Sequence, residues 1–314
     1  MLKVGLVGVG GITGSHIPAW ESFEDAELVA VCDIRQEMMD KCPTKRQYLD
    51  FDEMLANEEL DILDICLPTY LHADFAVKAM EKGINVICEK PISLKREDVA
   101  RIYETAERNN VKFMVAQVLR WWPAYEFVKE VYDSKKYGRL LSGSMTRLGC
   151  YPKWAWDGWM MDEKRSGMVP YDLHIHDLDF MVYAFGAPKK ATNFRSRQPD
   201  QDMLTAIYEY DDFYIMSEAS WYASPYPFSA KFRFQFENAV IANEGELTVY
   251  EKNGTVYQPS KEAAPGETGD IALPKTNAYA NEIRYFTDCV KNNTPVDKIK
   301  PKQLETVIDL LNAF

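Results

Sequence analysis

The segment Gly167–Gly186 holds the residues of this chain whose types and spacing best suit proton transfer. Asp172, His176 and Asp179 stand at i, i+4 and i+7, so on a helix they share one face, beside an apolar stripe. An aspartate one turn before a histidine can orient the ring and stabilise the imidazolium, which makes the histidine a candidate general base. A structural Asp–His hydrogen bond is the alternative. His174 points to another side of such a helix, so we predict no metal site here.

A glycine-rich turn follows the first apolar run of the chain. Gly8 and Gly10 match the first two glycines of a dinucleotide-binding turn, whereas Thr13 stands where a third glycine is usual. The glycines allow a tight turn and a close approach to pyrophosphate, and the following helix offers free amide donors. Asp33 ends the next strand, where a carboxylate accepts the ribose hydroxyls and repels a 2′-phosphate. This favours NAD over NADP, although Arg35 could soften the preference.

The sequence Cys88–Pro91 places Glu89 and Lys90 at the end of an apolar strand. A lysine there could hydrogen-bond a substrate hydroxyl and the nicotinamide ribose, and its charge would lower the pKa of a nearby acid. The alternative is a surface lysine that pairs with Glu89.

The first third of the chain alternates apolar runs with helical segments. Near-continuous apolar strands separated by helices predict a doubly wound parallel sheet, whose ligands bind at the carboxyl ends of the strands. Helices are expected from residue 34 and from an N-cap at Ser93. The predicted strands are residues 2–8, 26–33, 60–68, 84–91 and 112–118. The residues expected to contact the cofactor are Gly8, Gly10, Gly11, Ile12, Asp33, Arg35, Leu67, Pro68, Thr69, His72, Glu89 and Lys90.

The composition sets limits on the class of protein. A chain of 314 residues predicts two domains, which we place at 1–119 and 120–314, with a C-terminal helix that can pack back on the first. The formal net charge of −12 argues against nucleic acid as a partner. We expect no membrane span, and a strand that begins at Leu2 leaves no room for a signal peptide. Six scattered cysteines without metal-ligand spacing suggest a reduced, cytoplasmic protein.

The second half predicts a sheet with one solvated face. Residues 140–151 and 191–250 alternate aromatic or β-branched side chains with polar ones, and residues 251–270 are typical of an exposed loop. An aromatic cluster that includes Tyr151, Trp154 and Trp159 could stack on a sugar ring, or could instead be a packing cluster or subunit contact. The expected substrate contacts are Arg120, Trp122, Tyr151, Trp154, Trp159 and His174.

With these segments in view, the chain resembles the glucose-fructose oxidoreductase and inositol dehydrogenase family (Gfo/Idh/MocA) along essentially its whole length. The resemblance rests on four segments, residues 4–20, 27–33, 66–93 and 166–179. It implies a Rossmann domain followed by an α+β domain whose open, largely antiparallel sheet often forms dimer interfaces. It also implies that Lys90, Asp172 and His176 are catalytic.

Two departures from the family pattern bear on the site. Thr13 replaces a glycine or alanine, and residues 166–172 lack the second glycine of the usual pair, while His174 stands where glycine is common. The resemblance implies oxidation of a secondary hydroxyl of a cyclic polyol, sugar or sugar derivative with NAD, by a homodimer or homotetramer. Two alternatives stay open: redox-neutral glycoside cleavage through a transient keto-sugar, and a non-catalytic NAD or sugar sensor.

Overall fold

The computed structural model describes residues 1–42, 44–259 and 277–314. They divide into two compact units, one made of Met1–Val118 and the described part of Ala263–Leu304, the other of Leu119–Glu262 and Glu305–Phe314. The sequence-based division placed all of residues 120–314 in the second domain. The structure instead assigns α9 (Ala278–Lys291) to the first unit, because this helix packs on α1 (Thr13–Glu21) and Arg284 pairs with Asp25.

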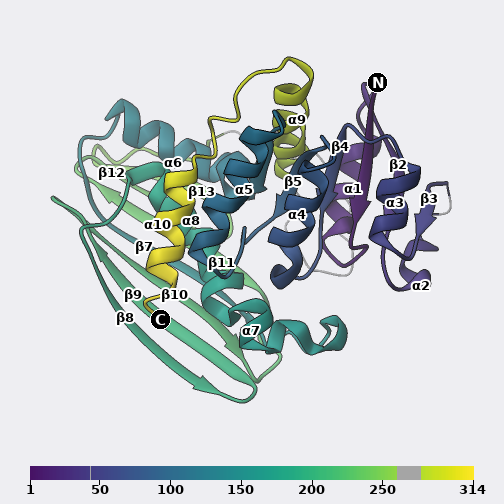
Figure 1. The fold of residues 1–314 in the computed structure, drawn as a ribbon. Coiled ribbons are helices and arrows are strands. Elements are labelled where there is room, and N and C mark those ends of the chain that lie inside the picture. The colour runs from purple at the N-terminus through teal and green to yellow at the C-terminus, as the bar shows by residue number, and fades with distance from the viewer. Residues whose placement is uncertain (43, 260–276) are drawn as a thin grey trace. The chain divides into compact units, whose positions relative to one another are not determined.

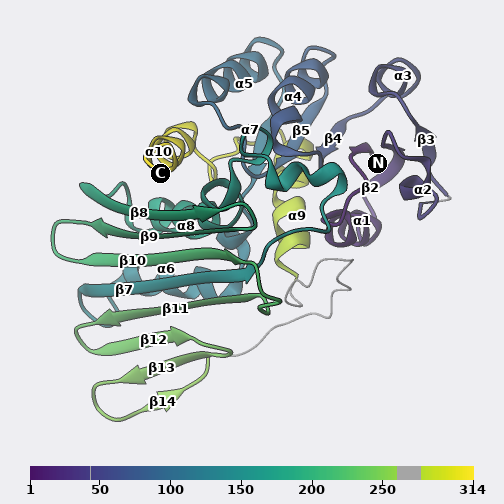
Figure 2. The same cartoon turned by 90° about the horizontal axis from the view of Figure 1, so that it is seen from below.

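The first unit is a doubly wound parallel sheet in the order β3-β2-β1-β4-β5-β6, which confirms the predicted Rossmann fold. Helices α4 and α5 lie on one side of this sheet, and α1 and α9 on the other (Figure 2). The central strands are almost entirely buried, as their apolar sequences require. The strands are β1 (Leu2–Val7), β2 (Ala26–Cys32), β3 (Arg46–Tyr48), β4 (Ile62–Ile65), β5 (Asn85–Glu89) and β6 (Phe113–Ala116). The helices between them are α2 (Gln36–Met39), α3 (Phe51–Asn57), α4 (His72–Met80) and α5 (Arg96–Arg108).

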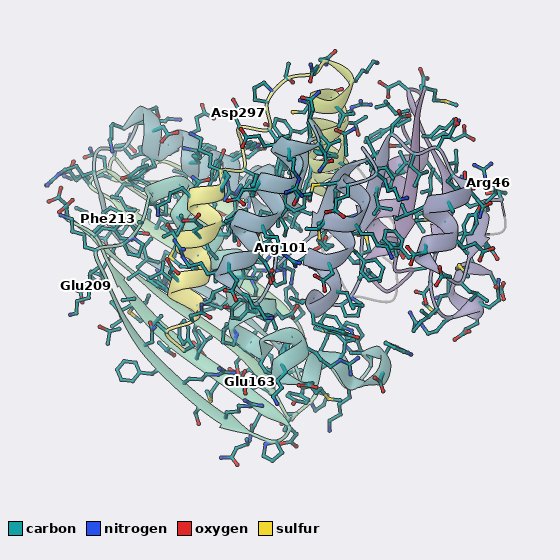
Figure 3. All side chains as sticks on the ribbon, viewed as in Figure 1. Arg46, Arg101, Glu163, Glu209, Phe213 and Asp297 are labelled. Atoms are coloured by element: carbon teal, nitrogen blue, oxygen red, sulfur yellow. The ribbon has the colours of Figure 1, made fainter. Side chains whose placement is uncertain are left out.

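Three local predictions for this unit need correction. The helix expected from residue 34 is only the four residues of α2, and the edge strand β3 and helix α3 were not predicted. Strand β3 is short and polar because it lies at the sheet edge. Its first residue, Arg46 (labelled in Figure 3), pairs with Glu58. Ser93 is not the N-cap of α5, since Lys95 holds that position; the Ser93 hydroxyl instead accepts from the Lys95 amide and donates to Asp98.

The second unit is built on an eight-stranded sheet (Figure 1), whose strand order β14-β13-β12-β11-β7-β10-β9-β8 can be followed in Figure 2. Its neighbouring strands are antiparallel except for the parallel pair β7 and β10, so the predicted open, largely antiparallel sheet is confirmed. The strands are β7 (Leu140–Cys150), β8 (Lys190–Gln198), β9 (Gln201–Glu209), β10 (Tyr214–Tyr222), β11 (Ser229–Phe236), β12 (Ala239–Asn243), β13 (Leu247–Glu251) and β14 (Val256–Tyr257). The helices are α6 (Pro123–Ser134), α7 (Glu163–Ser166) and α8 (Ile175–Phe185), and the unit boundary falls within α10 (Pro301–Leu311).

The stretch 251–270 was predicted to be a loop. Its described part instead contains β14, the last strand of the sheet, and its residues from 260 onward lie outside the described residues. Within the part of the chain that the structure covers, no helix has the length and apolar character needed to cross a bilayer.

Candidate active site

Gly8 makes the turn after β1 possible. Its φ of +88° lies in the left-handed region, and a Cβ there would come within 2.7 Å of the Cys66 carbonyl oxygen. Its amide donates to the Cys32 carbonyl, which fixes the turn against β2. Gly10 differs, since a Cβ there would meet nothing within 4 Å on the side it would occupy. That open side leaves room for a ligand to approach the backbone of Gly10 and Gly11.

Thr13 replaces the third glycine without opening the turn. It is the first residue of α1, is buried, and donates its hydroxyl proton to the Gly10 carbonyl over 2.6 Å. Helix α1 begins after Ile12 with no side-chain cap and no acidic residue in its first turn. Such a helix end attracts an anion, because its first amides and the positive end of its dipole are directed outward. These features fit the pyrophosphate of a dinucleotide.

Asp33 lies directly after β2 and beside the glycine turn. Its carboxylate accepts from the Val9 amide at 2.8 Å and from Nε and Nη2 of Arg35 at 3.1 and 3.2 Å. The turn and the carboxylate are thus held together, as a site for ribose hydroxyls requires. Arg35 neutralises part of the charge that would repel a 2′-phosphate.

The loop after β4 contains two half-exposed residues, Leu67 and Pro68, and two buried ones, Thr69 and His72. His72 places Nε2 2.7 Å from the Leu67 carbonyl and Nδ1 2.7 Å from the Pro91 carbonyl. Burial lowers its pKa despite these carbonyls. The ring therefore joins the loops after β4 and β5, and the expected contact of His72 with the cofactor stays a prediction.

Glu89 and Lys90 differ sharply in exposure, although they are neighbours. The Glu89 carboxylate faces inward: its Oε1 lies 3.1 Å from His16 Nε2, and its Oε2 accepts from the Lys90 amide at 3.0 Å. The residue is buried and holds the loop through the Lys90 amide, and its expected contact with the cofactor stays a prediction. Lys90 is half-exposed at the end of β5.

Asp172 and His176, in the second unit, are more exposed to solvent than their neighbours in the sequence. From Met168 to Val182 every other residue is buried, whereas these two are half-exposed. Asp172 lies in a π-helical turn, Pro170–His174, and His176 follows in the first turn of α8. Single π-helical turns often occur at functional sites. An acid and a histidine that alone reach the surface of a buried segment are positioned for proton transfer.

His174 is packed into the core of the second unit, and its expected contact with substrate stays a prediction. It is fully buried, with Nε2 2.6 Å from the Tyr208 hydroxyl and Nδ1 3.2 Å from the Ser217 hydroxyl. Burial, assisted by the Arg147 charge, lowers its pKa to about 3. The ring is a neutral core group that joins the π-helical turn to the sheet.

Arg120 is held in a buried ion pair, and its expected substrate contact stays a prediction. Its buried guanidinium donates through Nε and Nη2 to both oxygens of Asp179, at 2.8 and 2.6 Å, and stacks over Tyr183. Asp179 is therefore an ion-pair partner rather than a third member of the Asp172–His176 face. A second buried pair, Arg147 with Asp177 at 2.7 Å, was not predicted. Both pairs fix α8, the helix that carries His176.

The loop before the π-helical turn keeps a glycine-like backbone without the second glycine. Gly167 has a φ of +72° and Met168 a φ of +59°. The side chain of Met168 is fully buried, and the Val169 amide donates to the buried Asp202 carboxylate at 3.1 Å. Packing and this hydrogen bond hold Met168 in a conformation that other side chains rarely adopt.

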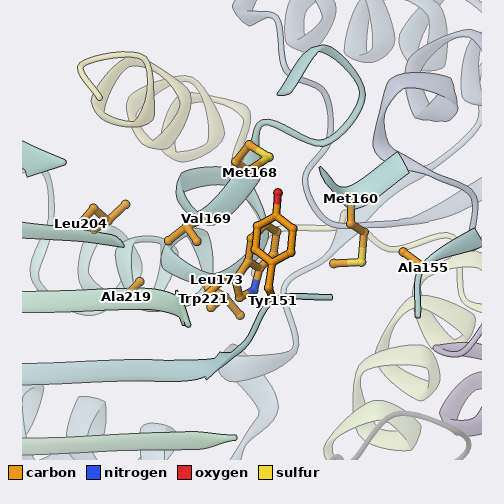
Figure 4. Close-up of a cluster of buried hydrophobic side chains, with 9 residues drawn as sticks. All are labelled: Tyr151, Ala155, Met160, Met168, Val169, Leu173, Leu204, Ala219 and Trp221. Carbon is orange, nitrogen blue, oxygen red and sulfur yellow. The ribbon is translucent and has the colours of Figure 1, made fainter. Parts of the chain in front are cut away.

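The aromatic cluster divides into a core part and a surface part. Tyr151 is buried in a hydrophobic cluster, with its ring edge-on to Trp221 (Figure 4). For Tyr151 the structure favours the interpretation as part of a packing cluster. Burial raises the pKa of its hydroxyl. Trp154 is 60% exposed, while Trp159 is half-exposed against the same cluster. Trp122, which precedes α6, is half-exposed. Each of these three tryptophans exposes part of its side chain to solvent.

Two family profiles match this chain. The profile described as "Oxidoreductase family, NAD-binding Rossmann fold" covers residues 2–117, and the GFO/IDH/MocA C-terminal domain profile covers residues 125–250. The chain therefore belongs to the Gfo/Idh/MocA family of NAD-binding oxidoreductases.

Individual relatives are more distant. D-apiose dehydrogenase of Paraburkholderia graminis is 29% identical over 59% of this chain and 50% of its own length. Myo-inositol 2-dehydrogenase of Thermotoga maritima is 26% identical over 59% of this chain and 55% of its own. These matches thus span about half of the relatives. An oxidoreductase from Agrobacterium radiobacter, crystallised with NAD+, L-tartaric acid and magnesium, shares the fold with a TM-score of 0.83 at 20% identity, over 99% of this chain and 94% of that one.

Proposed function

We propose that this protein is an NAD-dependent dehydrogenase that oxidises a secondary hydroxyl of a cyclic polyol, sugar or sugar derivative. The observation that carries the proposal is the paired exposure of Asp172 and His176 in a segment that is otherwise buried. The names of the relatives, which act on D-apiose and myo-inositol, support the substrate class.

The proposed chemistry uses the side chains of Lys90, Asp172 and His176. NAD, when bound, supplies the acceptor for the hydride. His176 takes the hydroxyl proton at Nε2, because its Nδ1 is a buried atom. Asp172 stabilises the imidazolium that results, and the Lys90 ammonium donates to the substrate oxygen as it gains negative charge.

The decisive experiment is NAD reduction, read optically, across inositols, hexoses, aldonates and glycosides. We expect one cyclic polyol or sugar class to be oxidised, with His176→Ala lowering kcat by a factor of about 10² to 10⁴ and NAD affinity retained. Lys90→Ala is run beside it. Unchanged turnover in His176→Ala would remove the residue from the mechanism.

The same panel separates the two alternatives. Release of a glycosidic substituent with no net reduction, from protein that retains NAD through purification, would replace the dehydrogenase with redox-neutral cleavage. Binding of NAD and sugar with no turnover would make the protein a sensor.

We further propose that the exposed face of the second unit's sheet joins two copies of this chain. Its outward residues include Phe194, Met203, Tyr214 and Met216, each more than 40% exposed. The strand register aligns Met216 with Ile207 and Ser144 on this face.

All six cysteines are free, which supports a reducing compartment such as the cytoplasm.

A further inference from the structure

A buried ionic chain lies under the loop that carries Lys90, and the proposed mechanism does not use it. His16, on α1, places Nδ1 2.8 Å from Asp64 Oδ2 and Nε2 3.1 Å from Glu89 Oε1. The side chains of His16 and Asp64 are fully buried, and that of Glu89 is 10% exposed. Glu89 Oε2 then accepts from the Lys90 amide at 3.0 Å. This series of contacts runs from Asp64 on strand β4 through His16 on α1 and Glu89 to the main-chain amide of Lys90.

The geometry favours an imidazolium. A neutral histidine has one N–H and can donate to only one of the two carboxylates, so its other nitrogen would face a carboxylate oxygen with a lone pair. The protonated ring donates to both. It also supplies the positive charge without which two buried carboxylates would be costly. Burial alone would lower the pKa of His16, but Asp64 and Cys66 raise it well above its usual range.

The surroundings of the ring add further support. The Trp20 indole donates to Asp64 at 2.7 Å, and the Cys66 thiol lies 3.6 Å from His16 Nδ1. Helix α9, which packs on α1, places the Tyr279 ring 6.0 Å from that of His16 and carries the buried carboxyl of Glu282. His16, Asp64 and Cys66 have metal-ligand types. The direct His16–Asp64 contact, however, already satisfies those atoms without an ion.

We propose that His16 and Glu89 are positioning residues for the catalytic lysine: the His16 imidazolium fixes the Glu89 carboxylate, which in turn fixes the main chain at Lys90. This inference rests on the proposed dehydrogenase function. Neither residue touches substrate in this scheme. Both act by holding the Lys90 amide, and so the start of its side chain, in one place.

The kinetic test is a double-mutant cycle with His16→Gln, Glu89→Gln and the pair. Each single change is expected to lower kcat about tenfold to a hundredfold, as a misplaced catalytic group does, with the Kd for NAD changed less than about threefold. The double variant should match the worse single variant, because both changes break one chain. Additive losses, or unchanged kcat, would overturn the proposal.

Trp20→Phe is the matched control. It removes another donor to Asp64 but leaves the His16–Glu89–Lys90 chain complete. It should lower the Tm and leave kcat within about twofold. If Trp20→Phe lowered kcat equally, the losses in the His16 and Glu89 variants would reflect a general loss of stability, and not the positioning of Lys90.

Two further measurements need no substrate and so separate this proposal from the dehydrogenase assignment. Amide hydrogen exchange at Lys90 should be faster in Glu89→Gln and His16→Gln than in the unchanged protein. ¹⁵N NMR of the unchanged protein should show the His16 ring as imidazolium at neutral pH, even if the variants fail to fold. A neutral His16 ring, or Lys90 exchange that does not change in variants that fold, would overturn it.

Discussion

At the scale of single residues, we expect the carboxylate of Asp33 to select between NAD and NADP. It is held by Val9 and by a two-point contact with Arg35. In Asp33→Ser the repulsion of a 2′-phosphate is removed, and the Arg35 guanidinium is released to pair with it. We expect the ratio of NADP to NAD affinity to rise by about ten- to a hundredfold, measured as Kd for each. Adding Arg35→Ala should abolish most of the gain; an unchanged ratio in Asp33→Ser would show that another group selects the cofactor.

His174 gives a pH dependence whose sign follows from its burial. Its folded pKa of about 3 lies below that of an unfolded histidine, so between these values the unfolded chain binds more protons. Its contribution to stability is therefore lost as the pH falls from about 6.5 toward 3. We expect the free energy of unfolding of His174→Gln to fall less steeply than that of the parent over this range, in urea titrations at several pH values. If the two proteins gave parallel curves, His174 would not be the group responsible for this pH dependence of the free energy of unfolding.

At the scale of elements, the turn between α7 and the π-helical turn depends on Gly167. A Cβ there would lie 2.5 Å from a ring carbon of Tyr171, at a φ of +72°. Gly167→Ala should thus cost about 2–3 kcal/mol of stability, from the clash and the backbone strain together. Gly83→Ala is the control, because its φ is +80° but nothing lies within 4 Å of the added carbon. It should cost only about 1 kcal/mol, and equal Tm losses in both would remove the Tyr171 contact from the explanation.

The same scale shows what the sequence could and could not predict. Strands β1, β2, β4, β5 and β6 are apolar runs, and the spacing of Gly8 and Gly10 is typical of a dinucleotide-binding turn. The Rossmann fold was therefore predictable. The short elements α2, β3 and α3 have too few residues for a periodic signal. The roles of Arg120 and His174 were missed because their partners, Asp179 and Tyr208, lie 59 and 34 residues away in the chain. Only folding brings such pairs together, so local patterns carry no sign of them.

At the scale of the whole molecule, the proposed contact between two copies has a direct test. Placing a lysine at Met216, which is 46% exposed on the outward face of the sheet, would bury a charge in the paired state. We expect Met216→Lys to shift the mass seen by light scattering toward the monomer at micromolar concentration. Leu49→Lys, at a 54% exposed apolar residue of the first unit, should leave the mass unchanged. An undisturbed dimer in Met216→Lys would place the contact elsewhere, and a parent protein that is itself monomeric would exclude the sheet as a pairing surface at that concentration.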